Sequence, residues 1–432
     1  MARIDLAVLI CDKPAGTLSQ DGNGLVSFTY NAGYSGAPLS LAMPVRNKTY
    51  RHAVVKPYLF GLLPDSEQQR RAIAGEHGVS ANNPVALLQH IGLDCPGAVQ
   101  FCSPEDIKAV QNRAGNMRKL SEHEIALRLK AIRTDLDATW MGSTESWSLG
   151  GNQGKFALAL KDGAWHECQG AAATTHIFKN GVAGFKLQAL NEYVCMRTAA
   201  RCGLQAAQVD YRLFEDEPAL IVSRYDRAVD QAGNILRLHQ EDLCQSLGVM
   251  PSQKYTSDGG PTASDALKLL AKTKHAQINI DLFTKALFFN CLIGAPDAHA
   301  KNYSLLLGAN SNALLAPLYD IASGLAYENA RHKGRLAMSI GGENRFGRVG
   351  RGAVARYAGK NDADLAQLLG QVGISAGHCL EAMADLAQLI PPAMTGVFDD
   401  AAASGIPQID ELREHLLAPV EENCQRTLAL LS

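Results

Sequence analysis

A short polar segment near residue 300 carries the residue types that phosphoryl transfer needs. It reads GAPDAHAKNYS over residues 294–304 and places Asp297 and Asn302 in an Asp-x4-Asn spacing. A carboxylate can orient or deprotonate an attacking hydroxyl, and an amide oxygen can hold Mg²⁺. Protein kinases combine these two groups at this same spacing in their catalytic loop. The segment therefore predicts a catalytic loop with Asp297 as the base and Asn302 as a metal ligand.

Three further side chains extend this prediction. Lys301 can neutralise charge on a transferring phosphoryl group, and His299 lies between the two key residues. Asp320 follows the apolar run LLAPLY, where kinases place a second metal carboxylate. Because Mg²⁺ takes one or two carboxylates plus phosphate oxygens, Asn302 and Asp320 would suffice as its protein ligands.

A glycine-rich stretch, SWSLGGNQGKF over residues 146–156, raises the question of a phosphate-binding loop. It is not the Walker motif, because Leu149 stands at the first glycine position and Phe156 at the hydroxyl position. Further along, Lys179 ends a strand-like run and Glu192 begins the next helix, as in the lysine–glutamate pair of kinases. Each feature alone fits an ordinary turn, strand end or helix start. The ordered series predicts an ATP site.

The elements that must position these residues change character along the chain. Residues 1–60 contain strand-like runs at 4–10, 24–30 and 39–45, and residues 61–95 look helical, with a Pro64-Asp65 start and a Gly78 stop. A helix is predicted from Ser121, with a capping box to Glu124. These features indicate a small β-rich domain followed by a polar connection.

From residue 155 the pattern predicts a second sheet followed by helices. A hairpin is expected around Asp162-Gly163, then a strand at 174–179, a helix at 191–203 and two more strand-like segments up to 226. After residue 227 the chain looks largely helical, including a helix at 281–293 with Asp281 as its cap and Gly294 as its end. We therefore predict a two-lobed arrangement with domains at 1–136, 137–226 and 227–432.

Composition limits the protein class. The 432 residues are 47% apolar and 19% charged, with a net charge of −2, so no global basic field draws the chain to nucleic acid or membrane. The apolar segment 282–295 is too short to span a bilayer, and the N-terminus lacks a signal-peptide pattern. Ten scattered cysteines without a Cys-x-x-Cys pair argue against a zinc site. We expect a cytoplasmic protein with reduced thiols and no membrane association.

Longer strings in the sequence resemble the HipA family, the serine/threonine kinase toxins of bacterial toxin–antitoxin modules. They run from LFGLLPDSEQQRRAIA and CPGAVQF, through SLGGNQGK, TTHIFK, NEYVC, VSRYDR, QEDLCQSLG and KYTSDGGP, to GAPDAHAKNYS and LYDIAS. The resemblance covers nearly the whole chain. It implies an α+β, protein-kinase-like fold with a small β-rich N-terminal subdomain, a β-sheet N-lobe and an all-helical C-lobe. It also implies ATP and Mg²⁺ as cofactors.

The resemblance assigns roles to individual residues. Asp297 would be the catalytic base, His299 and Lys301 would shape its loop, and Lys179 would bind the ATP phosphates. The hinge around adenine would be Val222-Ser223-Arg224-Tyr225. The glycine-rich loop would cover the phosphates through Gly150, Gly151, Asn152, Gln153, Gly154 and Lys155, although Asn152 and Gly154 depart from the common family pattern.

Family membership further implies a regulatory serine. HipA-like kinases phosphorylate a serine at the start of the glycine-rich loop, and Ser148 holds that position. A phosphate adds about −1.5 to −2 charges to a loop that must fold over other phosphates. Like-charge repulsion then favours an open, inactive loop. Ser143 and Ser146 are nearby hydroxyls that could also be modified.

The partners are likewise implied by the resemblance. Family members phosphorylate cytosolic proteins, in the best-known case glutamyl-tRNA synthetase, and thereby inhibit translation and cause growth arrest and persistence. A HipB helix-turn-helix antitoxin neutralises them, and the complex represses its own operon, with operator DNA contacted mainly through the antitoxin.

Two other functions are compatible with parts of the sequence. In small-molecule kinases of the aminoglycoside type the histidine precedes the aspartate by two, whereas here His299 follows Asp297 by two. A non-catalytic scaffold or co-repressor would need none of Lys179, Asp297, Asn302 and Asp320, yet all four are present. Intact residues do not prove turnover, so the scaffold stays an alternative.

Overall fold

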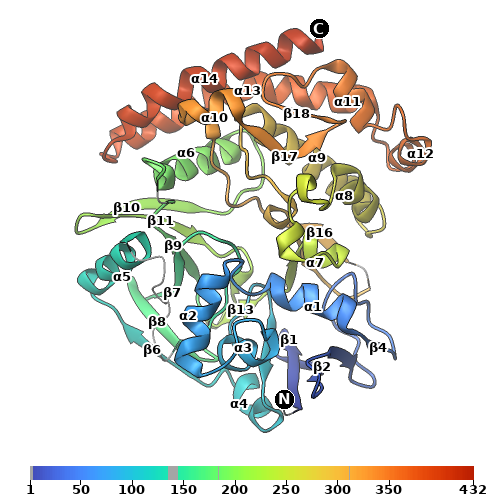
Figure 1. The fold of residues 1–432 in the computed structure, drawn as a ribbon. Coiled ribbons are helices and arrows are strands. Elements are labelled where there is room, and N and C mark those ends of the chain that lie inside the picture. The colour runs from blue at the N-terminus through green and yellow to red at the C-terminus, as the bar shows by residue number, and fades with distance from the viewer. Residues whose placement is uncertain (1–2, 135–144, 183, 311) are drawn as a thin grey trace. The chain divides into compact units, whose positions relative to one another are not determined.

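Contacts divide the chain into two units. Figure 1 shows the helices and strands with their labels. The computed structural model describes residues 3–134, 145–182, 184–310 and 312–432. The first unit comprises Met1–Val182, Leu213–Ser252 and Leu305–Asn312. The second unit comprises Ala183–Arg212, Gln253–Ser304 and Ala313–Ser432. The domain boundaries predicted at residues 136 and 226 stay predictions from sequence.

The first unit begins with a five-stranded antiparallel sheet in the order β4-β3-β2-β1-β5. Its strands are β1 Ile4–Ile10, β2 Lys13–Gln20, β3 Val26–Tyr30, β4 Thr49–Tyr50 and β5 Val99–Cys102. Three helices accompany it: α1 His52–Gly61, α2 Glu67–His77 and α3 Pro84–Ile91. Helices α1 and α3 contact the sheet, and α2 contacts α3. The alternating apolar residues of the strands face these helices.

A second sheet follows in the same unit, with the strand order β11-β9-β7-β8-β6. These strands are β6 Gly115–Lys119, β7 Lys155–Lys161, β8 Ala164–Gly170, β9 His176–Lys179 and β11 Glu217–Ser223. Strand β10, Val209–Phe214, crosses the boundary after Arg212, where the chain changes unit. The predicted hairpin is confirmed, because Lys161 pairs with Ala164 and Asp162 and Gly163 have φ of 51° and 72°. Two successive positive φ values are what a type I′ turn requires.

The helix that covers this sheet is α5, Glu122–Thr134. The Ser121 amide donates to the Glu124 carboxylate over 2.8 Å, and the Glu124 amide donates to Ser121 Oγ over 3.2 Å. The capping box predicted from sequence is therefore confirmed. Helix α5 contacts β11, and its buried residues Ile125 and Leu129 join the core.

One large apolar core runs through both sheets of the first unit, beside two smaller buried clusters. It includes Leu6 and Phe28 of the first sheet together with Phe156, Phe178 and Phe214 of the second. The rings of Phe156 and Phe178 stack with centroids 5.2 Å apart. Because one core serves both sheets, the glycine-rich loop between them is anchored to a continuous body.

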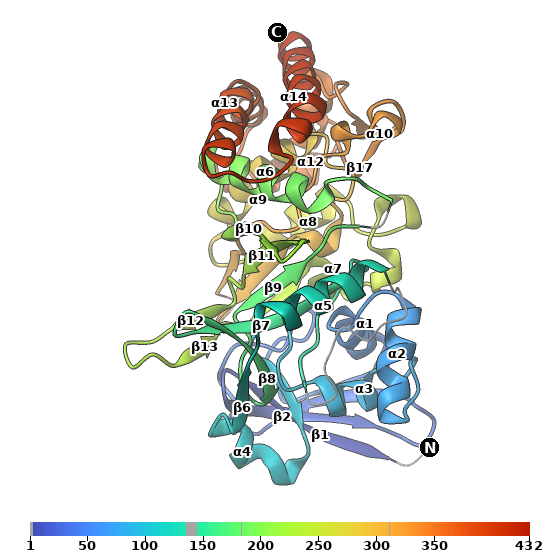
Figure 2. The ribbon, with the colours of Figure 1, turned by 90° about the vertical axis from the view of Figure 1, so that its left-hand side faces the viewer.

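The remaining elements of the first unit are short. They are η1 Pro104–Asp106, α4 Ile107–Gln111, β12 Arg227–Val229, β13 Ile235–Arg237, β14 Gln240–Asp242 and α7 Leu243–Leu247. Strands β12 and β13 form a hairpin whose tip projects from this unit (Figure 2). Helix α7 begins at a capping box between Asp242 and Gln245. η2 Pro251–Gln253 and β15 Ser304–Leu307 lie at the points where the chain changes unit.

The second unit is mostly helical. Its helices are α6 Gln188–Arg201, η3 Thr256–Asp258, α8 Ala263–Leu270, α9 Ala276–Leu292, η4 Ala300–Asn302, η5 Gly324–Ala326, α10 Glu328–Lys333, α11 Arg351–Tyr357, α12 Ala363–Gln371, α13 Ala376–Ala403 and α14 Ile409–Leu431. Helices α13 and α14 run side by side (Figure 1), and α13 also contacts α6 and α9. No helix among the described residues is long and apolar enough to cross a membrane.

Several local predictions differ from the structure. The segment after residue 226 is not wholly helical, since it also carries β12 to β15 and the strands β16 Ala313–Leu315, β17 Arg335–Ile340 and β18 Glu343–Arg345. Residues 39–45 form no strand, only an isolated bridge between Ser40 and Met43. Residues 13–20, which carry a proline and a glycine, form β2 instead. Strand pairing with β1 and β3 outweighs weak local propensity there.

Two helix starts were also misplaced. The helix predicted from 281 begins at Ala276, so Asp281 lies inside it and pairs with Lys285 and His378. Helix α2 begins after Ser66, whose side chain accepts from the Gln69 amide, and not at Pro64-Asp65. In both cases an acidic side chain suggested a cap, but long-range contacts and a better cap residue decided the boundary.

Candidate active site

The predicted catalytic loop starts where helix α9 ends, at Gly294. This glycine has φ of +67°, and a Cβ built on it would lie 2.4 Å from Leu325 Cγ. The Ala295 amide donates to the Asn290 carbonyl over 2.8 Å, which closes the helix C-terminus. The Gly324 amide donates to the Gly294 carbonyl over 2.8 Å. Gly294 therefore permits both the left-handed turn and the close approach of the segment that follows Asp320.

The loop that follows is buried except at one side chain. Ala298, His299, Ala300, Lys301 and Asn302 are buried, whereas the Asp297 side chain is 60% exposed. The loop is fixed through the backbone of this exposed residue. Asn302 Nδ2 donates to the Asp297 carbonyl over 2.7 Å, and the His299 amide donates to it over 2.8 Å. The geometry presents one carboxylate to solvent on a rigid backbone.

The His299 imidazole lies next to the Asp297 carboxylate. Its side chain is 4% exposed, and its Nε2 lies 3.7 Å from Asp297 Oδ1. Burial lowers the pKa of His299 below its usual value, more strongly than the nearby Asp297 raises it. The imidazole is therefore neutral at pH 7, which suits a residue that shapes the loop better than one that carries positive charge.

Tyr319, the residue before the predicted metal ligand Asp320, is hydrogen-bonded to the catalytic loop and to the strand after it. The Tyr319 hydroxyl donates to the Lys301 carbonyl over 2.6 Å and lies 2.7 Å from Ser304 Oγ. Asp320 itself has φ of +58°, in the left-handed region, which aspartate adopts more readily than most residues with a side chain. The chain therefore turns at Asp320, directly after the tyrosine that is hydrogen-bonded to the catalytic loop.

The donor set fits Mg²⁺ bound with ATP. An amide and a carboxylate supply hard oxygen atoms, and the Asn302 nitrogen is already engaged by the Asp297 carbonyl, which leaves its oxygen to accept. Among the described residues no group of three or more His, Cys, Asp or Glu side chains could hold a metal. Mg²⁺ that binds with ATP takes one or two protein ligands and completes its shell with phosphate oxygens and water.

Glu192 lies on helix α6, which is tied to the Asp320 segment through its neighbour Asn191. The Asn191 amide nitrogen donates to the Ser323 carbonyl over 2.7 Å, and the Ser323 amide donates back to Asn191 Oδ1 over 3.0 Å. The Ser323 hydroxyl donates to the carbonyl of Ile293, next to Gly294. Asn191 thus links the helix of Glu192, which is 1% exposed, to both ends of the catalytic region.

The glycine-rich loop belongs to the first unit and is docked on its helices. Ser148 is 1% exposed, and its hydroxyl donates to the Leu62 carbonyl. Its amide donates to the Asp94 carbonyl over 3.1 Å. Farther along, the Asp65 amide donates to the Gly151 carbonyl over 3.1 Å, and Gln69 Nε2 donates to the Asn152 carbonyl over 3.0 Å. Four residues, Leu62, Asp65, Gln69 and Asp94, therefore hold the loop through hydrogen bonds.

Two lysines of the same unit stand directly opposite each other. Lys155 of β7 pairs with Lys179 of β9, so both side chains point to one face of the sheet, and both are buried. Lys155 Nζ comes within 2.7 Å of where a Cβ on Gly151 would lie. The φ of +98° at Gly151 places the loop backbone over this ammonium. Paired cations beside a glycine-rich backbone suit a polyphosphate ligand.

The predicted adenine hinge continues from β11. Val222 is buried, and Ser223 and Tyr225 are half-buried, with the Tyr225 hydroxyl donating to Gln240. Arg224 behaves differently from its neighbours. Its guanidinium binds Asp226 in a fork, at 3.0 Å from Nε to Oδ1 and 2.8 Å from Nη2 to Oδ2, and it also reaches Asp94. Arg224 is a buried structural residue, a role that the sequence did not reveal.

Asp94 is the centre of the buried group that Arg224 joins, which we call the Asp94 cluster. It contains Asp94, Thr174, Arg224, Asp226, Arg227 and Arg237. The Asp94 amide also donates to the Ser146 carbonyl over 3.1 Å. The cluster therefore holds the start of the glycine-rich loop and the hinge in one network. The string LDCPGAVQF carried the signal, since a lone aspartate before a buried strand needs cationic partners.

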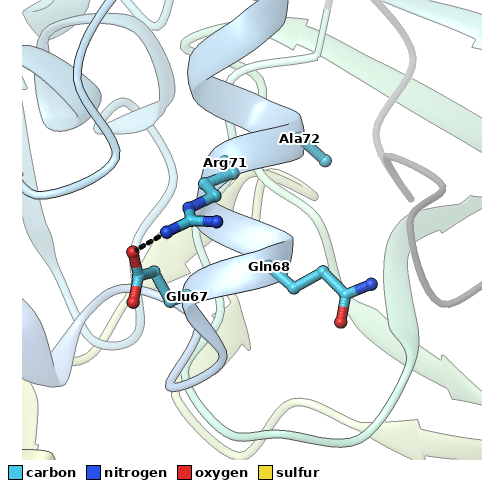
Figure 3. A pocket seen from close by; sticks show the side chains of 4 residues that line it. All are labelled: Glu67, Gln68, Arg71 and Ala72. Atoms are coloured by element: carbon cyan, nitrogen blue, oxygen red, sulfur yellow. Dashed lines mark hydrogen bonds and ion pairs between the residues drawn. The ribbon is translucent and has the colours of Figure 1, made fainter.

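A surface hollow lies on the outer face of helix α2 and is lined by Glu67, Gln68, Arg71 and Ala72 (Figure 3). Arg71 forms an ion pair with Glu67 there, at 2.6 Å. None of the predicted site residues lines this hollow. Gln69, on the buried side of the same helix, holds the loop instead.

Comparison with known proteins agrees with the sequence resemblance. A family model described as the HipA-like C-terminal domain matches residues 147–393, and one described as the HipA N-terminal domain matches residues 6–102. A putative kinase of Sinorhizobium fredii is 37% identical over 338 residues, which cover 76% of this chain and 78% of the relative. The serine/threonine-protein kinase toxin HipA of Shewanella oneidensis is 30% identical over 357 residues, 79% of each chain.

A solved structure matches the fold over almost its full length. The chain aligns with Shewanella oneidensis HipA, solved with HipB and operator DNA, at a TM-score of 0.80 and 26% identity, covering 98% of both chains. This match confirms the α+β, kinase-like fold class predicted from the sequence.

Proposed function

Because the chain belongs to the HipA family, we propose that it is an ATP- and Mg²⁺-dependent protein serine/threonine kinase that acts as the toxin of a toxin–antitoxin module. Its curated relatives include named kinases and a HipA toxin. The observation that carries the proposal is the exposed Asp297 carboxylate on a loop that is otherwise buried. Stability alone does not require the backbone of an exposed aspartate to be held by two hydrogen bonds. Phosphoryl transfer does require a positioned base.

In this mechanism each side chain of the catalytic loop has a separate role. Asp297 accepts the proton of a target hydroxyl as the new oxygen–phosphorus bond forms and the bond to the β-phosphate oxygen breaks, and ADP leaves with that electron pair. Lys301 offsets charge on the phosphoryl group, and His299 shapes the loop. Asn302 and Asp320 would hold Mg²⁺, which supplies charge neutralisation at the phosphates when bound.

The nucleotide would be held by the glycine-rich loop, the hinge and Lys179. Backbone amides of Gly150, Gly151, Asn152, Gln153 and Gly154, together with Lys155, cover the phosphates. Val222, Ser223 and Tyr225 would border the adenine, and Glu192 is the residue that corresponds to the helix glutamate of other kinases.

Ser148 would be the site of self-inactivation. In the docked loop its hydroxyl is 1% exposed and bound to the Leu62 carbonyl, so it must leave this seat before it can accept a phosphate. A phosphate of about −1.5 to −2 charges cannot return to a buried site without a cationic partner. Phosphorylation would therefore lock the loop out and stop ATP from being covered.

The wider role follows the family. We propose a cytoplasmic toxin that phosphorylates an aminoacyl-tRNA synthetase, such as glutamyl-tRNA synthetase, and so inhibits translation and promotes persistence. The solved relative is assembled with HipB and operator DNA. A helix-turn-helix antitoxin of that kind would bind this chain and contact the operator, with the three domains 1–136, 137–226 and 227–432 acting as subdomain, N-lobe and C-lobe.

The test compares purified wild type, Asp297→Ala and Asp385→Ala after phosphatase treatment and phosphatase removal. Asp385 is an exposed carboxylate of helix α13 and serves as the matched control. Incubation with Mg²⁺ and labelled ATP should label wild type and Asp385→Ala on Ser148, located by mass spectrometry, and leave Asp297→Ala unlabelled. Equal labelling of all three proteins, or no ADP formation by any, would overturn the kinase proposal.

A further inference from the structure

The hydroxyl of Tyr255 touches the carboxylate that the proposed function uses as its base. Tyr255 lies in the segment before η3, and its hydroxyl donates to Oδ1 of Asp297. We propose that Tyr255 is a positioning residue, which fixes the rotation of the Asp297 carboxylate so that Oδ2 faces the target hydroxyl. This inference rests on the proposed kinase function and names a residue that the catalytic loop itself does not contain.

The Tyr255 ring is held on several sides within the second unit. Its edge meets the His299 ring with centroids 4.9 Å apart and planes at 85°, and the Lys254 ammonium lies 5.6 Å from its centroid. Such contacts are favourable for aromatic rings and cations. The Lys254 carbonyl also accepts from the Ala300 amide over 3.3 Å. The ring thus contacts the catalytic loop through His299, and the carbonyl of the preceding residue, Lys254, is hydrogen-bonded to the same loop.

The backbone around Tyr255 is equally fixed. The amides of Asp258 and Gly260 both donate to the Tyr255 carbonyl over 3.0 Å. A Cβ on Gly260 would lie 1.8 Å from the Gln253 carbonyl oxygen, so only glycine fits there. The string KYTSDGGP therefore forms a compact turn that holds Tyr255 against Asp297.

The contact itself has little value as a stability element. Asp297 is 60% exposed and Tyr255 is half-buried, and a hydrogen bond between solvated groups contributes little to folding. Within the described residues, Tyr255 is the one side chain that donates a hydrogen bond to this carboxylate. A rigidly held donor on an exposed acceptor is expected where the orientation of the acceptor matters.

The carboxylate can serve two hydroxyls at once. An ionised carboxylate has about four acceptor sites on two oxygens, so the Tyr255 hydroxyl on Oδ1 leaves Oδ2 for the target serine or threonine. The proton of the target hydroxyl passes to Oδ2 during transfer and then to water. Tyr255 keeps its own proton throughout, because Asp297 accepts the target's proton on the other oxygen.

The experiment uses the full-length chain and the conservative variant Tyr255→Phe, which keeps the ring and removes the hydroxyl. The readouts are kcat and KM for ATP from ADP formation with Mg²⁺, together with Tm. Tyr211→Phe, at a buried tyrosine of β10, is the matched control. We expect Tyr255→Phe to lower kcat about 10- to 100-fold with KM for ATP and Tm unchanged. Tyr211→Phe should leave kcat unchanged.

The two proposals fail in different ways. If wild type forms no ADP, the kinase function fails. If wild type is active and Tyr255→Phe has the same kcat, the positioning role is overturned. A parallel loss of kcat and Tm in Tyr255→Phe would also overturn it, since that result marks a structural residue.

Discussion

Asp94 and Asp297 are two carboxylates of this chain that are placed in opposite ways. Asp94 is 1% exposed and binds Arg224, Arg227 and Arg237 at 3.3, 2.8 and 3.1 Å. Asp297 is 60% exposed and takes one side-chain hydrogen bond in the described part of the chain. The first carboxylate has its lone pairs occupied by protein, and the second keeps most of them for a ligand.

The difference separates a carboxylate that stabilises the fold from one that is accessible for a reaction. Burial alone would raise the pKa of Asp94, but Arg227, Arg224 and Arg237 outweigh it, and the pKa lies well below its usual range. Such a group stays ionised and has no freedom to take up a proton. Asp297 keeps its backbone fixed and its carboxylate accessible, which a proton acceptor requires.

A third carboxylate sharpens the contrast inside the first unit. Glu241 is as buried as Asp94 but pairs with no arginine in the described ranges of the chain, and it accepts from the Leu41 amide over 2.8 Å. Burial raises its pKa to about 7, and the hydrogen bond from Leu41 only partly offsets this. Charge partners, and not burial alone, decide the protonation state of each carboxylate.

The largest expected effect comes from removing the charge of Asp94. Asp94→Asn leaves the buried arginines without one counter-charge, so we expect it to lower the free energy of unfolding by about 3–5 kcal/mol. Urea titration followed by circular dichroism measures this change. Asp297→Asn is the control and should leave stability within about 0.5 kcal/mol of wild type, because the site is exposed. Equal stability of Asp94→Asn and wild type would contradict a structural role for the cluster.

The next effect is a pH dependence that Glu241 imposes. Its folded pKa, about 7, is above the usual value of 4.5, so the stability that its protonated form contributes is present below pH 4.5 and lost as pH rises through 7. The loss amounts to about 3 kcal/mol at 1.36 kcal/mol per pH unit. Glu241→Gln keeps an acceptor for Leu41 and should remove this loss. The free energy of unfolding of wild type and Glu241→Gln, measured from pH 5 to 8, tests this prediction. Parallel pH profiles for the two proteins would refute a role of Glu241 in the pH dependence.

A smaller effect is expected at the helix end that starts the catalytic loop. Gly294→Ala adds a methyl group at φ of +67° and 2.4 Å from Leu325 Cγ. We expect a loss of about 1–3 kcal/mol in stability, with lower kinase activity because the loop shifts. Gly370→Ala is the matched control, since no atom lies within 4 Å of its added Cβ. Thermal melts of both variants distinguish a specific clash from a general effect of alanine.

The smallest effect concerns the docking of the glycine-rich loop. Gln69→Ala removes the hydrogen bond to the Asn152 carbonyl, 3.0 Å long, and should weaken docking by about 1 kcal/mol. Hydrogen exchange at the Ser148 amide should then rise about fivefold. Arg71→Ala, at an exposed residue of the same helix that pairs with Glu67, should leave exchange as in wild type. If the two variants exchange alike, Gln69 has no part in seating the loop.

Local features of the fold followed from the sequence. Asp162-Gly163 and the Ser121–Glu124 pair are short patterns whose hydrogen bonds form between near neighbours, and both were predicted correctly. The end of helix α9, predicted at residue 293 before Gly294, lies one residue earlier at Leu292, with Ile293 as its C-cap. The β2 strand and the true start of α9 were missed, because partners distant in sequence decide them.

The sequence alone determined the order of the candidate site residues and the family that this order resembles. The spacing of residues within a loop can be read from the sequence without knowing the fold. Only the tertiary structure decided what each side chain touches. It buried Ser148 against Leu62, placed Arg224 in the Asp94 cluster and set Tyr255 on Asp297. These contacts join residues 42 to 130 positions apart, and no local pattern encodes such pairs. Packing and charge pairing across the folded chain bring them together.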